Sequence, residues 1–252
     1  MNIKEYNAEN MGKQVLVLNE KDIKNLMYFS TVAKNQDVNG LVVSGKYVGF
    51  TDTYRLVVVK DTNEKLPGAD NTKIYSISVL EELKKARSMA ILKDGKLAIQ
   101  VEDEVTEYDP VPAARVPNIK MIIEDYIYEC YSKAKAVNKI TDDLVWKMLK
   151  ITDSSINRYF AFKNHKLVVT AYPNEQSRIS TEVLELESSK VDLVTNLNVK
   201  FVDLWLKFIK NERFDLSSGT TYSAVKFSAE NVNYVIMPMR MDSSWEDKWK
   251  NE

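Results

Sequence analysis

The sequence has few of the residues on which disulfide-linked folds and many enzyme active sites depend. It contains one cysteine, Cys130, and one histidine, His165, among its 252 residues. A single cysteine excludes a disulfide within the chain and is typical of a reducing compartment. A single histidine excludes most histidine-based metal centres and catalytic triads. We expect Cys130 to be a small core residue and His165 to lie in a polar turn between two strands.

Long apolar runs and an excess of one charge are also missing. No segment approaches the run of about 18 apolar residues that a membrane span needs, and the polar start MNIKEYNAEN does not resemble a signal peptide. The 35 Lys and Arg residues balance 36 Asp and Glu residues. A general basic coat for nucleic acid is therefore excluded, and any DNA contact must come from local segregation of charge. We expect a soluble, cytoplasmic protein with no membrane partner.

Motifs for catalysis are not evident either. The sequence contains no glycine-rich phosphate loop, no metal-ligand spacing and no recognisable pairing of a nucleophile with a base. Its most acidic stretch, residues 102–107, is typical of a charged hairpin surface. The prediction is that the protein is not an enzyme and uses no metal or cofactor.

What the sequence does contain is a regular alternation of strand and helix patterns. Residues 14–18 predict a strand, Asn19 an N-cap, and residues 20–35 an amphipathic helix. Strands are expected on either side of the turn at Ser44 to Lys46 and again after Thr51 to Thr53, followed by a helix over 78–88. Asp94 and Gly95 predict a hairpin turn.

The same pattern begins again after Pro110, Pro112 and Pro117. A helix is expected over about 125–137, strands within 159–172, and a helix over 198–211. The helix cores of the two halves recur at a spacing of about 120 residues, which indicates a repeat at the scale of a domain. The sequence therefore predicts an α+β protein of two repeated domains, each with two helices packed on an antiparallel sheet, joined near residues 111–118.

Three segments carry a resemblance to a known family. FTDTYRL (50–56), RVPNIKMII (115–123) and YVIMPMRM (234–241) resemble, in order and spacing, segments of the bacterial DNA polymerase III beta subunit, the sliding clamp. The resemblance implies the DNA clamp fold. Residues 1–116 would correspond to the middle domain of that family, residues 117–241 to its last domain, and residues 242–252 to an additional tail. Family members carry three such domains, so this would be a short member.

The resemblance also implies a pocket that receives short linear peptides from DNA polymerase and the clamp loader. Exposed methionines would give it an adaptable floor, and arginines would stand at its rim. Thr53 replaces the usual Gly of the family and Tyr54 the usual His. Without the resemblance, the MPM sequence is more typical of core packing in a last strand. The implied pocket residues are Val38, Thr51, Thr53, Tyr54, Arg55, Leu56, Pro117, Ile122, Ala224, Val235, Met237, Pro238, Met239, Arg240 and Met241.

A sliding clamp holds duplex DNA through cations that face phosphates without reading bases. Lysines lie beside the core stripe of every predicted helix, although any one such stripe is more often a solvated face. The candidate DNA-binding residues are Lys21, Lys24, Lys84, Lys85, Arg87, Arg115, Lys133, Lys135, Lys200, Lys207 and Lys210.

The function predicted from the resemblance is that of a processivity factor that encircles duplex DNA and tethers replication proteins. The alternative is a decoy or adaptor that binds replication peptides without encircling DNA. Family rings contain six domains, so a two-domain chain is expected to form a homotrimer. In the tail, Trp245 and Trp249 would share one helical face and cover an apolar surface, or else belong to a frayed terminus.

Overall fold

The structure is a computed structural model, and it places two compact units along the chain. Unit 1 comprises Met1–Tyr126 and Glu230–Tyr234, and unit 2 comprises Ile127–Ala229 and Val235–Glu252. A short segment near the end of the sequence therefore returns to unit 1. The assignment of residues 1–116 and 117–241 to two clamp domains remains a prediction. The residues that the structure describes are 3–10, 12–33, 40–112, 117–126, 130–136, 158–163, 166–174, 177–186, 193–210, 212–220 and 222–239.

Unit 1 is built from two antiparallel sheets. One sheet has the strand order β1-β6-β7-β8, and in the other β5, β2, β3 and β4 lie side by side. Its strands are β1 (Gln14–Asn19), β2 (Gly40–Gly45), β3 (Tyr47–Thr51), β4 (Arg55–Lys60), β5 (Ala69–Ser76), β6 (Ser88–Leu92), β7 (Leu97–Val101) and β8 (Glu104–Tyr108). Its helices and helical turns are α1 (Ile3–Asn10), α2 (Glu20–Tyr28), η1 (Ser30–Ala33), α3 (Val79–Leu83) and η2 (Met121–Asp125).

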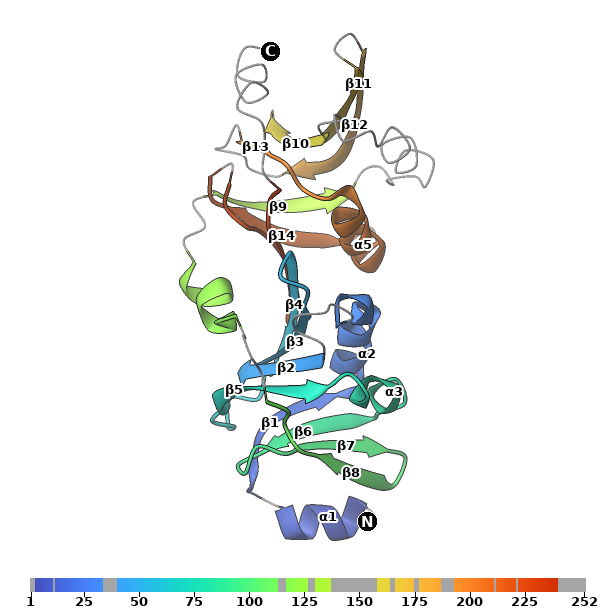
Figure 1. Cartoon of the computed structure of the whole chain (residues 1–252), viewed down its shortest axis with the longest axis vertical. Coiled ribbons are helices and arrows are strands. Elements are labelled where there is room, and N and C mark those ends of the chain that lie inside the picture. Colours follow the sequence, from blue (N-terminus) through green and yellow to red (C-terminus); the bar gives the residue numbers. More distant parts are fainter. Residues whose placement is uncertain are drawn as a thin grey trace. The chain divides into compact units, whose positions relative to one another are not determined.

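Helices α2 and α3 cover one side of these strands, and η2 lies on the other side (Figure 1). Asn19 caps α2, because its Oδ1 accepts a hydrogen bond from the Asp22 N–H at 3.0 Å. Phe29, which follows α2 directly, packs on Tyr234 with ring centroids 5.2 Å apart, and both rings are fully buried. The Lys60 N–H donates to the Asn231 carbonyl at 2.9 Å, which fixes the returning segment beside β4.

Unit 2 contains one sheet with the order β13-β10-β11-β12-β9-β14-β15 among its described strands. Helix α5 (Val199–Ile209) packs on this sheet through the fully buried Trp205, whose ring contacts Phe214 and Phe227. The strands are β9 (Cys130–Ala136), β10 (Arg158–Lys163), β11 (Lys166–Asn174), β12 (Ser177–Leu186), β13 (Leu193–Thr195), β14 (Arg213–Ser218) and β15 (Val225–Ala229). Strand β16 (Val232–Ile236) divides between the two units.

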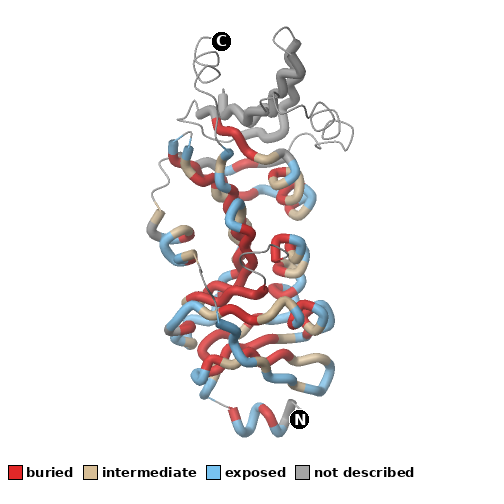
Figure 2. The backbone as a smooth tube through the Cα atoms, in the orientation of Figure 1, coloured by how far each residue is buried: buried red, intermediate tan, exposed pale blue. Residues whose placement is uncertain are grey.

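Most of the predicted elements are confirmed. The strand at 14–18, the cap at Asn19, the turn at Ser44 to Lys46 and the helix from 198 onward are all present. Gly95 has φ +88°, a left-handed conformation that glycine adopts readily in a tight hairpin turn. The buried positions follow the strands of unit 1, whereas α1 is mostly exposed (Figure 2). Helix α1 itself has no counterpart among the predicted elements.

Three helix predictions were wrong in extent or in kind. The helix expected over 20–35 ends at Tyr28 and continues as the separate turn η1. The helix expected over 78–88 ends at Leu83, because the Arg87 N–H already donates to the Gln100 carbonyl of β7 at 2.9 Å. The helix expected over 125–137 is strand β9 at residues 130–136.

Strand β9 shows why the third prediction failed. Small residues at 130, 132, 134 and 136 alternate with Tyr131, Lys133 and Lys135. Ala134 is buried while Lys133 is exposed, which is the two-residue period of a strand with one covered face. Spacings of three and four residues among the same small side chains had favoured a helix.

Candidate peptide-binding and DNA-facing surfaces

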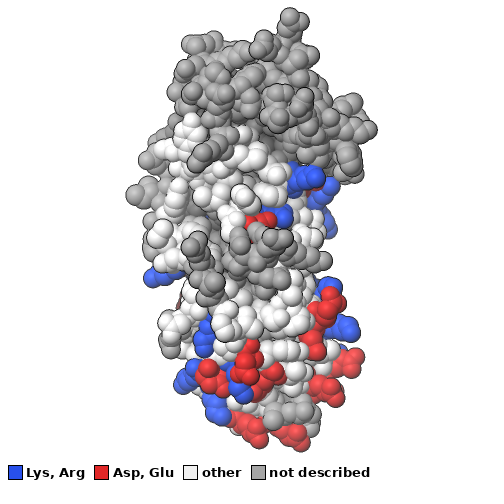
Figure 3. All heavy atoms as spheres, viewed as in Figure 1, with Lys and Arg blue, Asp and Glu red and all other residues white. Residues whose placement is uncertain are grey.

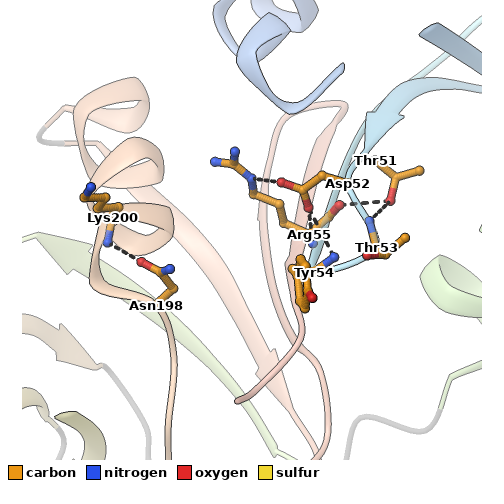
Figure 4. A network of polar contacts seen from close by, with 7 residues as sticks. All are labelled: Thr51, Asp52, Thr53, Tyr54, Arg55, Asn198 and Lys200. Carbon is orange, nitrogen blue, oxygen red and sulfur yellow. Dashed lines mark hydrogen bonds and ion pairs between the residues drawn. The ribbon is translucent and has the colours of Figure 1, made fainter. Parts of the chain in front are cut away.

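In unit 1, the predicted pocket residues of FTDTYRL form the turn between β3 and β4. Asp52 organises this turn: its Oδ1 accepts hydrogen bonds from the backbone N–H groups of Tyr54 at 3.1 Å and Arg55 at 2.9 Å (Figure 4). Its Oδ2 forms an ion pair with the Arg55 Nε at 2.7 Å. The side chains of Asp52 and Arg55 are only 12% and 14% exposed. Arg55 is thus engaged within its own turn and shapes the loop instead of standing free at a rim.

The turn presents one aromatic side chain outward. Tyr54 is 63% exposed, while its neighbours Thr51 and Leu56 are buried. Thr53 has φ +70°, a left-handed conformation that is unfavourable for a β-branched residue and natural for glycine. Because the Thr51 Oγ1 accepts from the Thr53 N–H at 3.3 Å and donates to the Arg55 carbonyl at 3.0 Å, the strained backbone is held from both sides.

Helical turn η2 carries Ile122, a further predicted pocket residue of unit 1. The Oδ1 of Asn118 caps it by accepting from the Met121 N–H at 3.0 Å. Ile119 and Ile123 are buried, so they anchor the turn, and Ile122 is half-buried. Met121 is 51% exposed, and the sequence analysis had not selected it. The pattern PNIKMII contains no signal that separates its buried apolar residues from its exposed ones.

In unit 2, the segment after β16 exposes two methionines. Met237 and Met239 are 42% and 40% exposed, and Pro238 is half-buried between them. The Met239 N–H donates to the Asn196 carbonyl at 2.7 Å, which fixes the segment to the loop before α5. Ala224 and Val235 are buried core residues. The MPM sequence therefore presents its methionines on the surface, as the resemblance implies, and does not pack them in a core.

Several predicted residues lie outside the described part of the chain. They are Val38, Arg240 and Met241 of the pocket, Arg115 of the DNA-binding set, His165, and the tail with Trp245 and Trp249. Pro117 is described and is half-buried at the start of the η2 segment. Tyr222, 55% exposed between β14 and β15, is a further surface aromatic that the sequence analysis did not select.

The helix lysines of unit 1 are exposed and largely ion-paired. Lys21 pairs with Glu230 at 2.7 Å, and Lys24 pairs with Glu20 on the same helix. Lys84 follows the end of α3 and pairs with Glu81 at 2.6 Å. Exposed ion pairs contribute at most about 1 kcal/mol, so a phosphate can replace the carboxylate at little cost. Such a face suits weak, salt-sensitive contacts with DNA.

Lys85 and Arg87 are also exposed, but the surface near Lys85 is acidic. Lys85 borders a hollow of about 330 Å³ that is otherwise lined by Glu81, Glu82, Glu102, Glu104, Val101 and Thr106. The four carboxylates outweigh the single lysine there. The end of α3 is accordingly a poorer DNA surface than the predicted helix over 78–88 suggested.

In unit 2, α5 carries the predicted lysine stripe on its exposed side. Asn198 caps the helix by accepting from the Lys200 N–H at 3.0 Å (Figure 4). Lys200, Lys207 and Lys210 are all exposed, and Lys207 pairs with Asp203 at 2.8 Å. Lys210 ends the helix with φ +57°. The opposite stripe, with Val202, Leu206 and Ile209, is buried as expected; the side chain of Val199 lies outside the described part of the chain.

Lys133 belongs to the other face of the same sheet. Ala134 is the register partner of Phe214, which contacts Trp205 of α5, so these residues share the helix-covered face. Lys133 is the register partner of Asp215 and pairs with it at 3.6 Å on the opposite face. The side chain of Lys135 lies outside the described part of the chain. The prediction that Lys133 and Lys135 extend a helical lysine face was wrong because β9 is a strand.

Unit 1 also contains an open cavity of about 580 Å³ beside η2. Its wall includes Tyr47, whose hydroxyl donates to the Glu124 carboxylate at 2.6 Å. Burial, together with the hydrogen bond to Glu124, raises the pKa of Tyr47. This bond ties η2 to strand β3. The other lining residues are Gly45, Lys46, Lys60, Asp61, Thr62, Glu64 and Lys120.

Within the described residues, no group of three or more His, Cys, Asp or Glu side chains is arranged to hold a metal ion. None of the described helices is long and apolar enough to cross a membrane.

Comparison with solved structures identifies the fold. No protein-family model and no curated protein matches this sequence. Among solved structures, the chain is similar to the DNA polymerase III beta subunit of Thermotoga maritima, with a TM-score of 0.67 and 15% identity over 90% of this chain and 65% of that one.

Two further structures agree with the first. The DNA polymerase III beta subunit of Pseudomonas aeruginosa aligns with a TM-score of 0.63 and 16% identity, covering 89% of this chain and 66% of that one. The DNA polymerase III beta chain from Streptococcus pneumoniae aligns with a TM-score of 0.65 and 15% identity, covering 89% of this chain and 64% of that one. This chain therefore spans less than two thirds of the length of each of these three structures.

Proposed function

Because this chain has the fold of the bacterial sliding clamps, we propose that it is a DNA sliding clamp. It encircles duplex DNA and tethers DNA polymerase and other replication proteins through a peptide-binding surface. The fold likeness over 90% of the chain is the observation that supports this function. Exposed, easily displaced lysine pairs on α2 and an exposed lysine stripe on α5 support weak contact with phosphates.

Topological retention is the property that separates an encircling clamp from a protein that merely binds DNA. We expect a clamp loader to place the protein on nicked circular DNA, where it remains at a salt concentration that abolishes ordinary phosphate contacts. Cutting the circle once should release it, because a ring slides off a free end. Protein that is never retained on the circle, but still binds replication peptides, would instead support the decoy or adaptor.

The peptide surface is proposed to take clamp-binding segments with a Gln and a Leu-Phe pair. The resemblance assigns Tyr54 of unit 1 and Met237 and Met239 of unit 2 to this surface. All three are exposed, and exposed apolar side chains are the usual anchors of peptide grooves. Leu56 is buried, so its replacement would disturb the unit itself and is unsuitable as a test.

Tyr54→Ala combined with Met239→Ala should weaken peptide binding by about 2 kcal/mol, as expected for loss of two anchor side chains. Fluorescence anisotropy of a labelled peptide measures this. Tyr28→Ala is the control, because Tyr28 is 43% exposed at the end of α2 and outside the proposed surface. Equal affinity of the double variant and the unmodified chain would remove the peptide surface from the proposal.

The working assembly is proposed to be a homotrimer. The resemblance implies six domains per ring, and a chain that contributes two of them needs three copies. Unit 1 ends in edge strand β8, and the described sheet of unit 2 ends in the short strand β13 beside β10. A head-to-tail contact between β8 of one copy and the β13 end of the next closes a ring and leaves neither of these two edges open.

A further inference from the structure

The edge strand β8 carries a covering helix. In the described part of the chain β8 pairs only with β7, so one side of its backbone is not paired with another strand. Helix α1 lies beside it, at the same end of unit 1 (Figure 1). Tyr6 of α1 packs in a buried cluster with Leu92 and Ala98, against which Val105 of β8 also packs. The helix therefore occupies the approach to the edge.

Few of the described side chains of α1 are buried. Among residues 5–10, only Tyr6 and Asn10 are buried, and the Asn10 side chain donates within the helix, to the Tyr6 carbonyl at 3.2 Å. Tyr6 is 3% exposed, and its hydroxyl has no hydrogen-bond partner among the described residues. A buried hydroxyl that lacks a partner opposes docking, because water would satisfy it in the undocked helix.

The chain is fixed in the sheet only after α1. Gly12 has φ +80°, and a Cβ built there would meet no atom within 4 Å. From Lys13 onward the backbone is held: the Lys13 carbonyl accepts from the Lys93 N–H at 2.8 Å, and β1 begins at Gln14. A glycine with left-handed φ between helix and strand is a natural pivot. The Lys13 N–H also donates to the Asn10 carbonyl at 3.0 Å, so release of α1 would loosen this turn and leave the pairing of β1 with β6 in place.

Charge adds little to the attachment of α1. The edge and its flanking turns carry Glu102, Asp103, Glu104, Glu107 and Asp109, and α1 carries Glu5 and Glu9 against one basic residue, Lys4. Lys96 pairs with Glu107 at 3.1 Å, which offsets one of the charges of the edge. Acidic and basic side chains both appear at this end of unit 1 (Figure 3). A helix with a net negative charge gains little from docking on an acidic edge.

The same charges suit a strand from unit 2 of another copy. Strands β10 and β11 include Arg158, Lys163 and Lys166 and contain no acidic residue. They lie next to β13, the strand that ends the described sheet of unit 2 and has no charged residue. An acidic edge and these basic strands are complementary in a head-to-tail contact.

We propose that α1 is a detachable cover on the β8 edge, and that the uncovered edge receives the basic end of unit 2 from a second copy of this chain. The inference rests on the proposed ring. In the single chain, α1 prevents the β8 edge from pairing with another strand. Ring closure and release of α1 are therefore coupled in one equilibrium.

The test compares the full chain with a chain lacking residues 1–11, with Tyr6→Ala and with Tyr6→Phe. Light scattering over a micromolar concentration series gives the concentration at which half of the protein is trimeric. Removing the helix, or its anchor, should lower that concentration about tenfold, because the cover no longer competes with the second copy. Tyr6→Phe should raise it severalfold, since it removes the unsatisfied hydroxyl and tightens docking. Asn7→Ala, at an exposed position of α1, should leave it unchanged.

Other outcomes of the light-scattering series would contradict the proposal. Equal half-assembly concentrations for the full and shortened chains would refute the cover and leave the ring intact. Weaker assembly of the shortened chain would show that α1 is part of the contact, which also overturns the proposal. If no chain forms a trimer at any concentration, both the ring and the cover are refuted. Faster hydrogen exchange of β8 amides in Tyr6→Ala than in Asn7→Ala, measured on monomers, would confirm that α1 shields this edge.

Discussion

At the scale of single residues, the backbone conformation at Thr53 is the one suited to Gly, the residue usual at this position in the clamp segments that this sequence resembles. Its φ of +70° is one that glycine adopts freely and a β-branched residue adopts with strain. We expect Thr53→Gly to raise the free energy of unfolding by about 1 kcal/mol, the strain relieved less the extra freedom of glycine in the unfolded chain. Denaturant unfolding measures it.

Thr106→Gly is the matched control for this change. Thr106 lies in strand β8 with ordinary backbone geometry, so glycine there should destabilise the protein. If Thr53→Gly destabilises as much as Thr106→Gly, the strain at Thr53 is not real. If instead it stabilises and also changes peptide selectivity, then the threonine side chain restricts the proposed groove.

The hydrogen bond from Tyr47 to Glu124 makes a second prediction at this scale. The pKa of Tyr47 is raised above its ordinary value of 10.0 by burial and by Glu124, so the folded state favours the protonated phenol. The corresponding stability is fully present below pH 10.0 and is lost as the pH rises further. Tyr47→Phe should cost about 1 kcal/mol at neutral pH and make the protein less sensitive to alkaline pH.

Unfolding measured at neutral pH and again above pH 10 checks both parts. Tyr54→Phe serves as the control, since Tyr54 is 63% exposed and should change neither. Because the bond holds η2, which carries Ile122 and Met121, Tyr47→Phe should also weaken peptide binding modestly. An unchanged alkaline transition in Tyr47→Phe would assign the alkaline loss of stability to other buried tyrosines, such as Tyr75 and Tyr234, whose pKa values burial also raises.

At the scale of elements, α5 is the clearest candidate for contact with DNA. Changing Lys200, Lys207 and Lys210 to Gln should weaken binding to duplex DNA of any sequence. It should also reduce the slope of log affinity against log salt by up to about 0.9 for each phosphate that a lysine no longer neutralises. Binding measured across a salt series gives both values. Peptide affinity should be unaffected, since the lysines lie on the exposed stripe of the helix.

Strand β9 supplies the control for the lysines of α5. Lys133 has the same charge and a similar exposure, 59% against 53% for Lys207, but lies on the sheet face opposite α5. Lys133→Gln should therefore leave DNA affinity and its salt slope unchanged. An effect as large as that of a single α5 lysine would mean that DNA does not approach the helix face.

At the scale of the whole molecule, assembly is the decisive property. Light scattering of the closed assembly should give about three times the 29.0 kDa mass of the chain. A stable dimer would contradict the six-domain ring. Because the proposed contact joins an acidic edge to a basic one, the trimer should dissociate more readily as salt rises. Assembly that strengthens with salt would point to an apolar contact elsewhere.

The sequence by itself determined the local elements whose signals lie within a few residues. The Asn19 cap, the Asp94 and Gly95 hairpin and the buried stripe of α5 follow from side-chain chemistry and periodicity, which act over short range. The three segments resembling the clamp family likewise predicted the fold that the structural comparisons show.

Tertiary structure decided what those short-range signals leave open. Helix or strand at β9 depended on pairing with β14, because its small residues fit either period. Exposure separated Met121, Met237 and Met239 from buried neighbours of similar hydrophobicity. Arg55 pairs with Asp52, and several helix lysines pair with nearby carboxylates. These ion pairs could be identified only in the folded chain. The physical reason is that burial and charge pairing depend on residues distant in sequence, which only the fold brings together.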